Sequence, residues 1–304
     1  MPAAHGSVAV VGGSSQIRKF LLPRLTGAGE RVTVFTRGKA GADVDVRWHA
    51  PYVGTPGDAL VKQGPFDALI WLAPLPTLPD ALAAAGTAGI RRVIAFGTTA
   101  RFYKGASGSA AERRLAGDMS AAEAELRRVA AGSGIAWTLF RPTLVYGCGM
   151  DENVAFIARM IRRWRFFPLV DGGRGLRQPV HADDLAGACL SALRNAATFG
   201  REYNLSGGQT LSYRAMVQEV FAGLGRTPRF VPVPGWLLKR LVSSLRILPR
   251  YRSLSPDMVD RMSMDLCFGH EQARRDFGYA PRPFRLDATA LAQNDNGIDP
   301  AGPA

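Results

Sequence analysis

The sequence predicts an α/β protein with a Rossmann-like, doubly wound parallel sheet and a smaller C-terminal substrate lobe. Short apolar runs alternate with helical periodicities in the first half of the chain, which is the pattern of βαβ units. The first run ends in a glycine turn that leads directly into a helix. With 304 residues, 47% of them hydrophobic, the chain is long and apolar enough to bury a full core.

The apolar runs set the order of the expected elements. We expect strands in 7–13, 31–38, 66–74, 91–99 and 135–147, because each run is short, apolar and bounded by turn residues. Helical spacing predicts helices through 20–29, 78–89 and from about 110 to 131, the last ending at the "GSG" that follows.

The pattern changes after Tyr146, where glycine and proline become denser and the strand signals shorten. We therefore expect a dinucleotide-binding domain over residues 1–150, to which residues 178–203 return. Residues 151–177 and 204–290 are expected to form the smaller substrate lobe. Residues 291–304 are polar and contain glycine and proline, so we expect a disordered tail.

Charge and cysteine usage narrow the partners. The net charge of +13 favours anionic ligands. The arginines are scattered without the dense basic run typical of nucleic-acid tails, so nucleic acid is not favoured as a partner. Three cysteines without C-x-x-C spacing indicate neither a disulfide framework nor a zinc site, and we expect no metal. Without an expected signal peptide or an apolar run long enough to span a membrane, we expect a cytoplasmic protein.

The stretch "VAVVGGSSQIRKFLLPRL" carries a degraded G-x-x-G-x-x-G motif. Gly12 fills the first position, Ser15 the second and Arg18 the third, where a long cation must either swing outward or hold the helix away from the strand. The start of the helix still offers free N–H groups to a phosphate. We predict a cofactor site in this turn, the alternative being a turn that no longer binds; its residues are Gly12, Gly13, Ser15, Gln16, Ile17 and Arg18.

The end of the second strand indicates which cofactor is preferred. NAD-binding folds place an acidic residue there for the ribose 2′-hydroxyl, whereas a basic residue accommodates a 2′-phosphate. Thr36, Arg37 and Lys39 occupy this region and no acid does. We therefore predict that NADP(H) binds in preference to NAD(H), with Arg37 as the contact; the alternative is that Arg37 is a solvated turn residue.

Several segments follow one another in the order of a known family: "LIWLAP", "AFGTTARFY", "LFRPTLVYG", "GRGLRQPVHADDLA" and "YNLSGGQTLSY". Over residues 7–285 the chain resembles the extended branch of the short-chain dehydrogenase/reductase superfamily, the nucleotide-sugar epimerases and dehydratases. The resemblance implies a nicotinamide cofactor and a C-terminal substrate lobe. It also implies that Ala73 and Thr98 lie beside the cofactor and that Thr99 supplies the active-site hydroxyl.

The catalytic pair of this family is missing. The chemistry needs a tyrosine as acid/base and a lysine four residues later on the same helical face. The best alignment places Leu115 and Met119 at these positions, and the chain contains no Y-x-x-x-K. Thr99 and Tyr103 remain the catalytic candidates, Tyr103 together with Lys104 as a substitute pair. The alternative is that Tyr103 and Lys104 lie on a solvent-facing loop.

The second lobe retains more of the pattern. The resemblance implies that Arg177 binds a substrate diphosphate, which suits a guanidinium fork, and that Asn153 also contacts substrate. In "HADD" we expect an Asp to cap the following helix, with catalysis by His181 as the less favoured alternative. Cys148 is expected to be an inert thiol, because no His–Asp pair recurs near it.

Residues 236–248, "WLLKRLVSSLRIL", indicate an amphipathic helix. Leu237, Leu238, Leu241, Leu245 and Leu248 fall along one predicted face, and the basic residues lie mostly off it. Either this face packs onto the core of the substrate lobe, or it forms a peripheral contact with acidic lipid or a protein partner.

Three functions are therefore open. The first is an atypical NADP(H)-dependent reductase or epimerase-like enzyme acting on a nucleotide-linked or polyprenyl-linked sugar. The second is a catalytically silent NADP(H)-binding sensor, scaffold or subunit, similar to a dehydrogenase-like accessory subunit of respiratory complex I. The third is a membrane-surface or protein-interaction module that uses the fold without cofactor. The missing Tyr–Lys pair favours the second over ordinary turnover, whereas the phosphate-binding arginine and the threonines favour the first.

Overall fold

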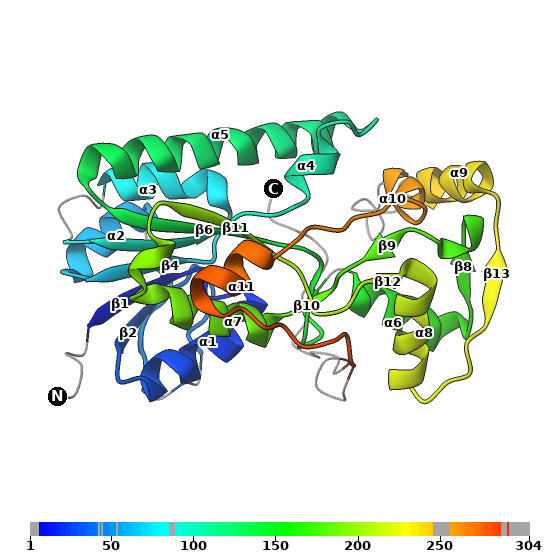
Figure 1. The fold of residues 1–304 in the computed structure, drawn as a ribbon, viewed down its shortest axis with the longest axis horizontal. Helices are drawn as coiled ribbons and strands as arrows, with labels where there is room; N and C mark the ends of the chain where they lie inside the picture. The colour runs from blue at the N-terminus through cyan, green and yellow to red at the C-terminus, as the bar shows by residue number, and fades with distance from the viewer. Residues whose placement is uncertain are drawn as a thin grey trace.

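The computed structural model describes residues 6–41, 43, 45–52, 54–84, 89–151, 153–245, 256–286 and 291. These residues form two lobes that lie side by side (Figure 1). The first lobe is built on a large parallel sheet, and the second is a smaller helical lobe with short strands.

Seven parallel strands make the sheet in the order β11–β6–β5–β4–β1–β2–β3. Their bounds are β1 (Ser7–Val11), β2 (Arg31–Phe35), β3 (Arg47–His49), β4 (Ala68–Trp71), β5 (Arg92–Phe96), β6 (Ala136–Pro142) and β11 (Arg201–Leu205). The order reverses at β1, which pairs with β2 on one side and β4 on the other. Ligands of open α/β sheets bind at the carboxyl ends beside such a reversal. The predicted fold class is confirmed.

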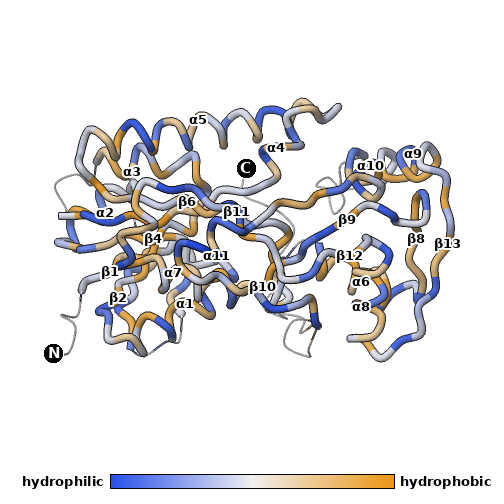
Figure 2. Tube along the Cα trace, in the orientation of Figure 1, coloured by the Kyte–Doolittle hydropathy of each residue, from blue (hydrophilic) through white to orange (hydrophobic). Residues whose placement is uncertain are grey.

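Helices cover both faces of the sheet. One face carries α1 (Gln16–Gly27), α7 (Ala182–Leu193) and α11 (Glu271–Phe277), and the other carries α2 (Pro56–Gln63), α3 (Leu78–Ala84) and α5 (Ala110–Ser133). Along β1, Val8 and Val10 belong to the first hydrophobic cluster and Ala9 and Val11 to the second. Burial on both faces explains why β1 and β4 are almost continuously hydrophobic, and Figure 2 shows hydrophobic stretches along the sheet.

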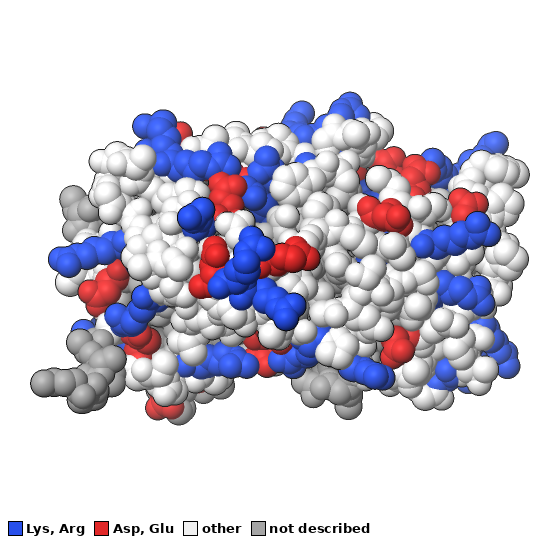
Figure 3. Space-filling model, viewed as in Figure 1, with Lys and Arg blue, Asp and Glu red and all other residues white. Residues whose placement is uncertain are grey.

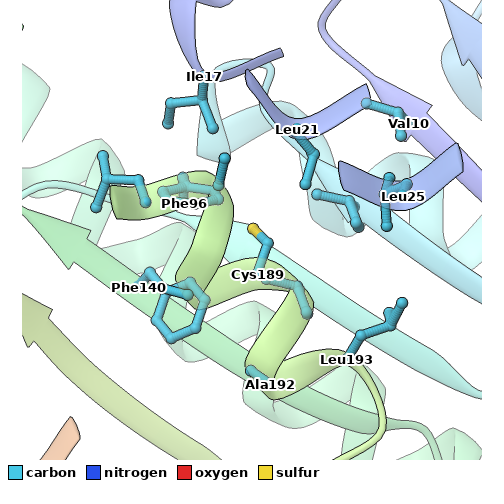
Figure 4. Close-up of a cluster of buried hydrophobic side chains, with 14 of the residues drawn as sticks. Val10, Ile17, Leu21, Leu25, Phe96, Phe140, Cys189, Ala192 and Leu193 are labelled. Carbon is cyan, nitrogen blue, oxygen red and sulfur yellow. The ribbon is translucent and has the colours of Figure 1, made fainter. Parts of the chain in front are cut away.

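The contact between α1 and α7 anchors the helix that begins at the glycine turn. Leu21 and Leu25 of α1 lie close to Cys189 and Leu193 of α7 (Figure 4), and all four side chains are buried. Arg24 of α1 also pairs with Asp183 at 2.6 Å. The α1 helix is therefore fixed to the sheet by packing and by this ion pair.

The second lobe has its own hydrophobic core. It contains α6 (Val154–Trp164), α8 (Tyr213–Gly223), α9 (Gly235–Leu245) and α10 (Asp257–Arg261). Short ladders pair β7 (Val145–Tyr146) with β10 (Val180–His181), β9 (Leu176–Arg177) with β12 (Leu211–Ser212), and β8 (Phe167–Leu169) with β13 (Phe230–Pro232).

The structure differs from the expected elements at three places. It adds β3 and α2, for which the sequence pattern was too short. It also places α11 in the first lobe, because Ala273 and Tyr279 pack into the first hydrophobic cluster rather than into the substrate lobe expected at 204–290. The expected α3 is described only to Ala84, and the expected tail lies outside the described residues apart from Leu291. Among the described residues, no helix is long and apolar enough to cross a membrane.

Candidate functional site

The turn between β1 and α1 keeps the shape that a dinucleotide site needs. Gly12 has φ = 109°, and a Cβ atom there would lie 2.6 Å from the amide nitrogen of Ala73. A Cβ atom on Gly13 would lie 2.6 Å from the Cβ of Thr36. The turn therefore packs between the ends of β4 and β2, as close backbone approach requires. Of the predicted cofactor residues, the structure brings Gly12, Gly13 and Ala73 together.

The two replaced glycine positions have local structural roles. Ser15 is the N-cap of α1, and its hydroxyl accepts a hydrogen bond from the amide of Ile17 at 3.3 Å. Arg18 swings outward: its Nη1 lies 3.2 Å from the carboxylate of Asp43, and its guanidinium lies 5.1 Å from the centre of the Trp48 ring. Among the described residues, its buried Nε has no hydrogen-bond partner. The arginine thus reaches toward the β2–β3 side of the turn.

Gln16 and Ile17 face away from the turn. The Gln16 amide donates to the carbonyl of Val145 at 3.4 Å, which ties the first turn of α1 to β7. The Cys148 thiol lies 3.9 Å from the Gln16 carbonyl oxygen, and burial raises its pKa, as expected for an unreactive thiol. The Ile17 side chain belongs to the hydrophobic core.

The end of β2 is basic and accessible. Arg37 and Lys39 are exposed, and Thr36 contacts the glycine turn. Burial raises the pKa of Tyr52, and the charge of Arg37 opposes that shift, which places the guanidinium beside this phenol. Asp43, the first acidic residue after β2, is paired with Arg18. A cationic surface therefore borders the turn on the side where a ribose would lie.

The threonines after β5 differ in availability. Thr99 is buried, and its hydroxyl donates to the carbonyl of Pro142 at 3.1 Å, so it holds the β5 and β6 ends together. The Thr98 hydroxyl accepts from the amide of Ala100 at 3.1 Å and is half-buried. Thr98 is the more accessible of the two hydroxyls.

The positions of the family's acid/base pair hold apolar side chains. Leu115 is 40% exposed on α5, and Met119, one turn later, packs partly against the second core cluster. Neither side chain can give or take a proton.

Tyr103 and Arg177 are brought together. Tyr103 lies on α4 (Arg101–Lys104); burial raises its pKa, and the charges of Arg261 and Arg177 oppose that shift. The Arg177 guanidinium is buried over the Tyr213 ring and donates to the carbonyls of Leu176 and Met264, each at 2.7 Å, and to that of Arg261. The geometry thus fixes Arg177 on backbone carbonyls at the boundary of the two lobes.

A cluster of ion pairs joins the lobes at the same boundary. Glu112, in the first turn of α5, accepts from Arg261 of α10 at 2.8 Å and lies 3.6 Å from the ammonium of Lys104. Asp257 of α10 accepts from the amide of Ser109, the N-cap of α5, at 3.0 Å. We call Lys104, Glu112, Asp257 and Arg261 the interlobe cluster.

The remaining predicted residues lie at helix starts. Asn153 is the exposed N-cap position of α6, but the capping group is Asp151, whose Oδ1 accepts from the amides of Asn153, Val154 and Ala155. His181 is the N-cap of α7, its Nδ1 accepting from the amide of Asp183 at 3.1 Å. The expectation that an Asp caps α7 is therefore wrong, because the His181 side chain accepts the hydrogen bond from the free amide at the start of the helix.

Sequence reasoning missed a buried ionic network beside the site. Glu123 of α5 is fully buried and binds Arg141 of β6 through bonds of 2.9 and 2.5 Å, and it also pairs with Arg101 of α4. Burial lowers the pKa of Arg141, but its hydrogen bonds with Glu123 and Glu202 outweigh that effect. The sequence signal that could have predicted this network is the arginine inside the apolar run "TLFRP", because a buried cation requires a nearby anion. No group of residues suited to a metal ion occurs in the part of the chain described.

The fold is that of an α/β protein with a second lobe beside the sheet. Residues 78–206 match the model of the NAD dependent epimerase/dehydratase family. The suggested resemblance is confirmed as a similarity to this family.

Curated relatives include sugar-nucleotide epimerases and reductases. A UDP-glucose 4-epimerase of Vibrio cholerae is 24% identical over 182 residues, covering 58% of this chain and 53% of that protein. A 2-alkyl-3-oxoalkanoate reductase of Stenotrophomonas maltophilia is 30% identical over 171 residues, covering 52% and 51%. Subunit 9 of the NADH dehydrogenase [ubiquinone] 1 alpha subcomplex of Arabidopsis thaliana is 27% identical over 140 residues, covering 46% and 33%. The chain spans about half the length, or less, of the curated relatives it matches.

Solved structures share the fold over most of the chain. UDP-glucose 4-epimerase of Thermotoga maritima with UDP-glucose has a TM-score of 0.65 at 17% identity, covering 90% of this chain and 93% of that one. MoeE5 in complex with UDP-glucuronic acid and NAD has a TM-score of 0.67 at 18% identity, covering 92% and 95%. At these identities the likeness shows the fold.

Proposed function

We propose that the protein binds NADP(H) at the β1–α1 turn and acts through that binding, as a sensor, scaffold or subunit, without hydride transfer through a Tyr–Lys pair. The observation that carries the proposal is a contrast within one site. Gly12 and Gly13 keep the backbone approach that a pyrophosphate needs, whereas Leu115 and Met119 stand where the acid/base pair would be. The similarity to a protein named as subunit 9 of the NADH dehydrogenase [ubiquinone] 1 alpha subcomplex supports a role as a subunit.

The cofactor would lie across the carboxyl ends of β1, β2 and β4. The free amides at the start of α1 would receive its pyrophosphate, and Arg37 with Lys39 would receive a 2′-phosphate. Ala73 and Thr98 would border the remaining length. When bound, the cofactor would supply a nicotinamide ring, while the protein orients it and offers hydrogen-bond donors to its phosphates.

Titration calorimetry with NADPH and NADH tests this proposal. We expect NADPH to bind about tenfold more tightly, because one charge-assisted contact is worth roughly 1.5 kcal/mol. Arg37→Ala should weaken NADPH and leave NADH unchanged. Arg31→Ala, an exposed arginine at the opposite end of β2, is the matched control. Equal affinities for the two cofactors would remove the role given to Arg37.

The boundary between the lobes is proposed to take a nucleotide sugar or another anionic small molecule. Arg177 and Arg261 place two guanidinium groups beside Tyr103, and Asn153 is accessible at the start of α6. The structural neighbours named above hold UDP-glucose and UDP-glucuronic acid. UDP-glucose is the probe, and Arg177→Ala should weaken it by roughly 1.5–3 kcal/mol, the scale of a charged hydrogen bond. If the binding free energy of UDP-glucose falls by less than about 0.3 kcal/mol, Arg177 serves only the backbone carbonyls that it contacts.

An enzymatic role is the second candidate, and the position of Tyr103 favours it. Burial raises the pKa of this phenol and the charges of two nearby arginines only oppose that rise, so Tyr103 is a candidate proton donor. If the protein oxidises NADPH with a keto-sugar nucleotide and Tyr103→Phe does not, the enzymatic role replaces the silent one. If neither protein oxidises NADPH while both bind it, the silent role stands.

A further inference from the structure

The exposed side of α9 is a surface that the cofactor site does not use. Trp236 is 65% exposed, Leu237 46% and Leu241 54%, while Leu238 and Val242 are buried in the core of the second lobe. With 3.6 residues per turn, the exposed residues fall on one side of the helix and the buried ones on the other. The helix therefore turns an apolar strip outward.

This arrangement corrects the expected leucine face. The sequence placed Leu237, Leu238 and Leu241 together, but only Leu238 faces the core, because Val242 continues its line one turn later. The side chain of Leu245 and the whole of Leu248 lie outside the description. Leu237 and Leu241 thus remain uncovered within the described structure.

The elements around α9 are strongly basic. Residues 154–169, 213–245 and 257–261 contain ten Lys and Arg residues and three acidic residues, Glu219, Asp257 and Asp260. Figure 3 shows basic side chains at this end of the molecule with a few acidic ones among them. In the described part of the chain, two of these ten have an ion pair: Lys239 with Asp260 at 2.6 Å and Arg261 with Glu112 at 2.8 Å. The positive charge at this end is therefore largely uncompensated.

Aromatic residues lie among these cations. Trp164 is 47% exposed and Phe166 38%, and their rings stack with centroids 6.3 Å apart. Arg163 and Arg165, next to them in the sequence, are exposed. The two aromatic residues are connected to α9 through the ribbon of β8 and β13, since β8 follows Phe166 directly and α9 begins soon after β13. Of the eleven large apolar side chains exposed among the described residues, six lie on this ribbon, at its start or on α9.

We propose that this end of the second lobe docks on the surface of an anionic phospholipid bilayer. Trp236, Leu237 and Leu241 would enter the boundary between head groups and acyl chains, where tryptophan is favoured, and the arginines would contact lipid phosphates.

The same charges argue against a second copy as the occupant. Two such surfaces facing each other would bring uncompensated positive charges together, which costs free energy. A bilayer that contains anionic lipid offers the complementary charge and an apolar layer at once. The proposal is independent of the function assigned to the cofactor site.

Vesicle co-sedimentation tests the proposal. The full chain should sediment with vesicles of phosphatidylcholine and phosphatidylglycerol, only weakly with phosphatidylcholine alone, and less as salt is added. Replacing Trp236, Leu237 and Leu241 together by serine should lower the partition coefficient by about tenfold or more. Val61→Ser, at an exposed apolar residue on α2, should change nothing. Arg240→Glu should weaken binding and Arg114→Glu on α5 should weaken it less.

The outcomes separate the possible occupants. Absence of sedimentation with anionic vesicles, or equal sedimentation of the triple variant, would overturn the proposal. A dimer seen by light scattering that the triple variant abolishes would assign the surface to a second copy instead. NADPH titration of every variant reports whether the first lobe is intact, so a failed cofactor site and a failed membrane surface give different results.

Discussion

The β1–α1 turn and the α4–α5 segment lie at the same edge of one sheet, but only the turn keeps the feature that the family's site requires. At the turn, two motif glycines have been replaced, and the backbone still packs as closely as a cofactor turn requires. At the α4–α5 segment, the residues at the acid/base positions are apolar, and the start of α5 is bound to the second lobe through Glu112 and Ser109. The turn retains the backbone path of a cofactor turn. The α4–α5 segment contains the interlobe cluster and has no Tyr–Lys pair.

This contrast shows that binding and chemistry depend on different physical requirements. A phosphate turn needs a backbone path, which other residues can supply if the close contacts of Gly12 and Gly13 remain. A proton donor needs one particular side chain in one place, and a leucine cannot substitute for it. Substitutions at the two regions should therefore have separable effects.

The largest effect on stability is expected at the buried ionic network of Glu123, Arg141 and Arg101. Glu123→Gln removes the buried anion of Arg141 and leaves that guanidinium with the partly exposed Glu202, so the free energy of unfolding should fall by about 3 kcal/mol. Glu125→Gln removes an exposed pair with Arg128 on the same helix and should cost much less. Urea unfolding of both variants measures the difference. Similar losses would mean that the network does not hold the α4–α5 segment.

Gly12→Ala addresses the turn itself. The added Cβ would overlap the backbone of β4 at a positive φ, so we expect about 2–3 kcal/mol of destabilisation and a loss of NADPH binding. Gly117→Ala on α5, where nothing lies within 4 Å, should instead stabilise by roughly 0.5–1 kcal/mol. Full NADPH affinity in Gly12→Ala would place the cofactor elsewhere.

The sequence predicts the parts of the fold that repeat a strong local signal. The apolar runs locate β1, β2, β4, β5 and β6, because strands buried on both faces are hydrophobic throughout. It does not predict β3, which has three residues, or the place of α11, whose few buried residues depend on a partner far along the chain. The leucine face predicted for α9 differs from its buried side, because helical periodicity locates an apolar stripe without showing which side of the helix packs on the core.

The candidate site follows the same rule. The glycine turn and the missing acid/base pair can be read from local motifs. Other features of the site depend on segments that are distant in the sequence. Arg18 pairs with Asp43, Thr99 donates to the carbonyl of Pro142, and Arg177 donates to the carbonyl of Met264. No local pattern encodes them.

Glu112→Gln opens the interlobe cluster. Burial raises the pKa of Glu112, but hydrogen bonds from Arg261 and Ser107 outweigh it and hold the pKa below its ordinary value. A carboxyl with a lowered folded pKa adds stability above its unfolded pKa of about 4.3, and this stability is lost as the pH falls through the folded value. We expect Glu112→Gln to lose about 1–2 kcal/mol at neutral pH and to show a shallower loss than wild type in acid. If wild type and Glu112→Gln show the same dependence of unfolding free energy on pH, the Glu112 carboxylate does not stabilise the contact between the lobes.

The smallest effect, and the sharpest for the turn, is expected from Arg18→Gly. Arg18 lies on the β2–β3 side, paired with Asp43 and over Trp48, so it does not wedge α1 away from β1. We predict that the guanidinium contacts a cofactor phosphate when the cofactor binds, so the variant should bind NADPH about three- to tenfold more weakly. Arg18→Met keeps the aliphatic stem and should lose the same amount, which separates the charge from the flexibility that glycine adds to the helix.

Comparing both cofactors tells which phosphate Arg18 serves. A loss confined to NADPH assigns the guanidinium to the 2′-phosphate, and an equal loss with NADH assigns it to the pyrophosphate. Tighter binding by Arg18→Gly would show that the side chain obstructs the turn. If neither wild type nor variant binds NADP(H) at about millimolar concentration, a free energy of only some −4 kcal/mol, the turn keeps its shape without its ligand. The fold would then serve an interaction through the second lobe, and α9 would become its principal functional surface.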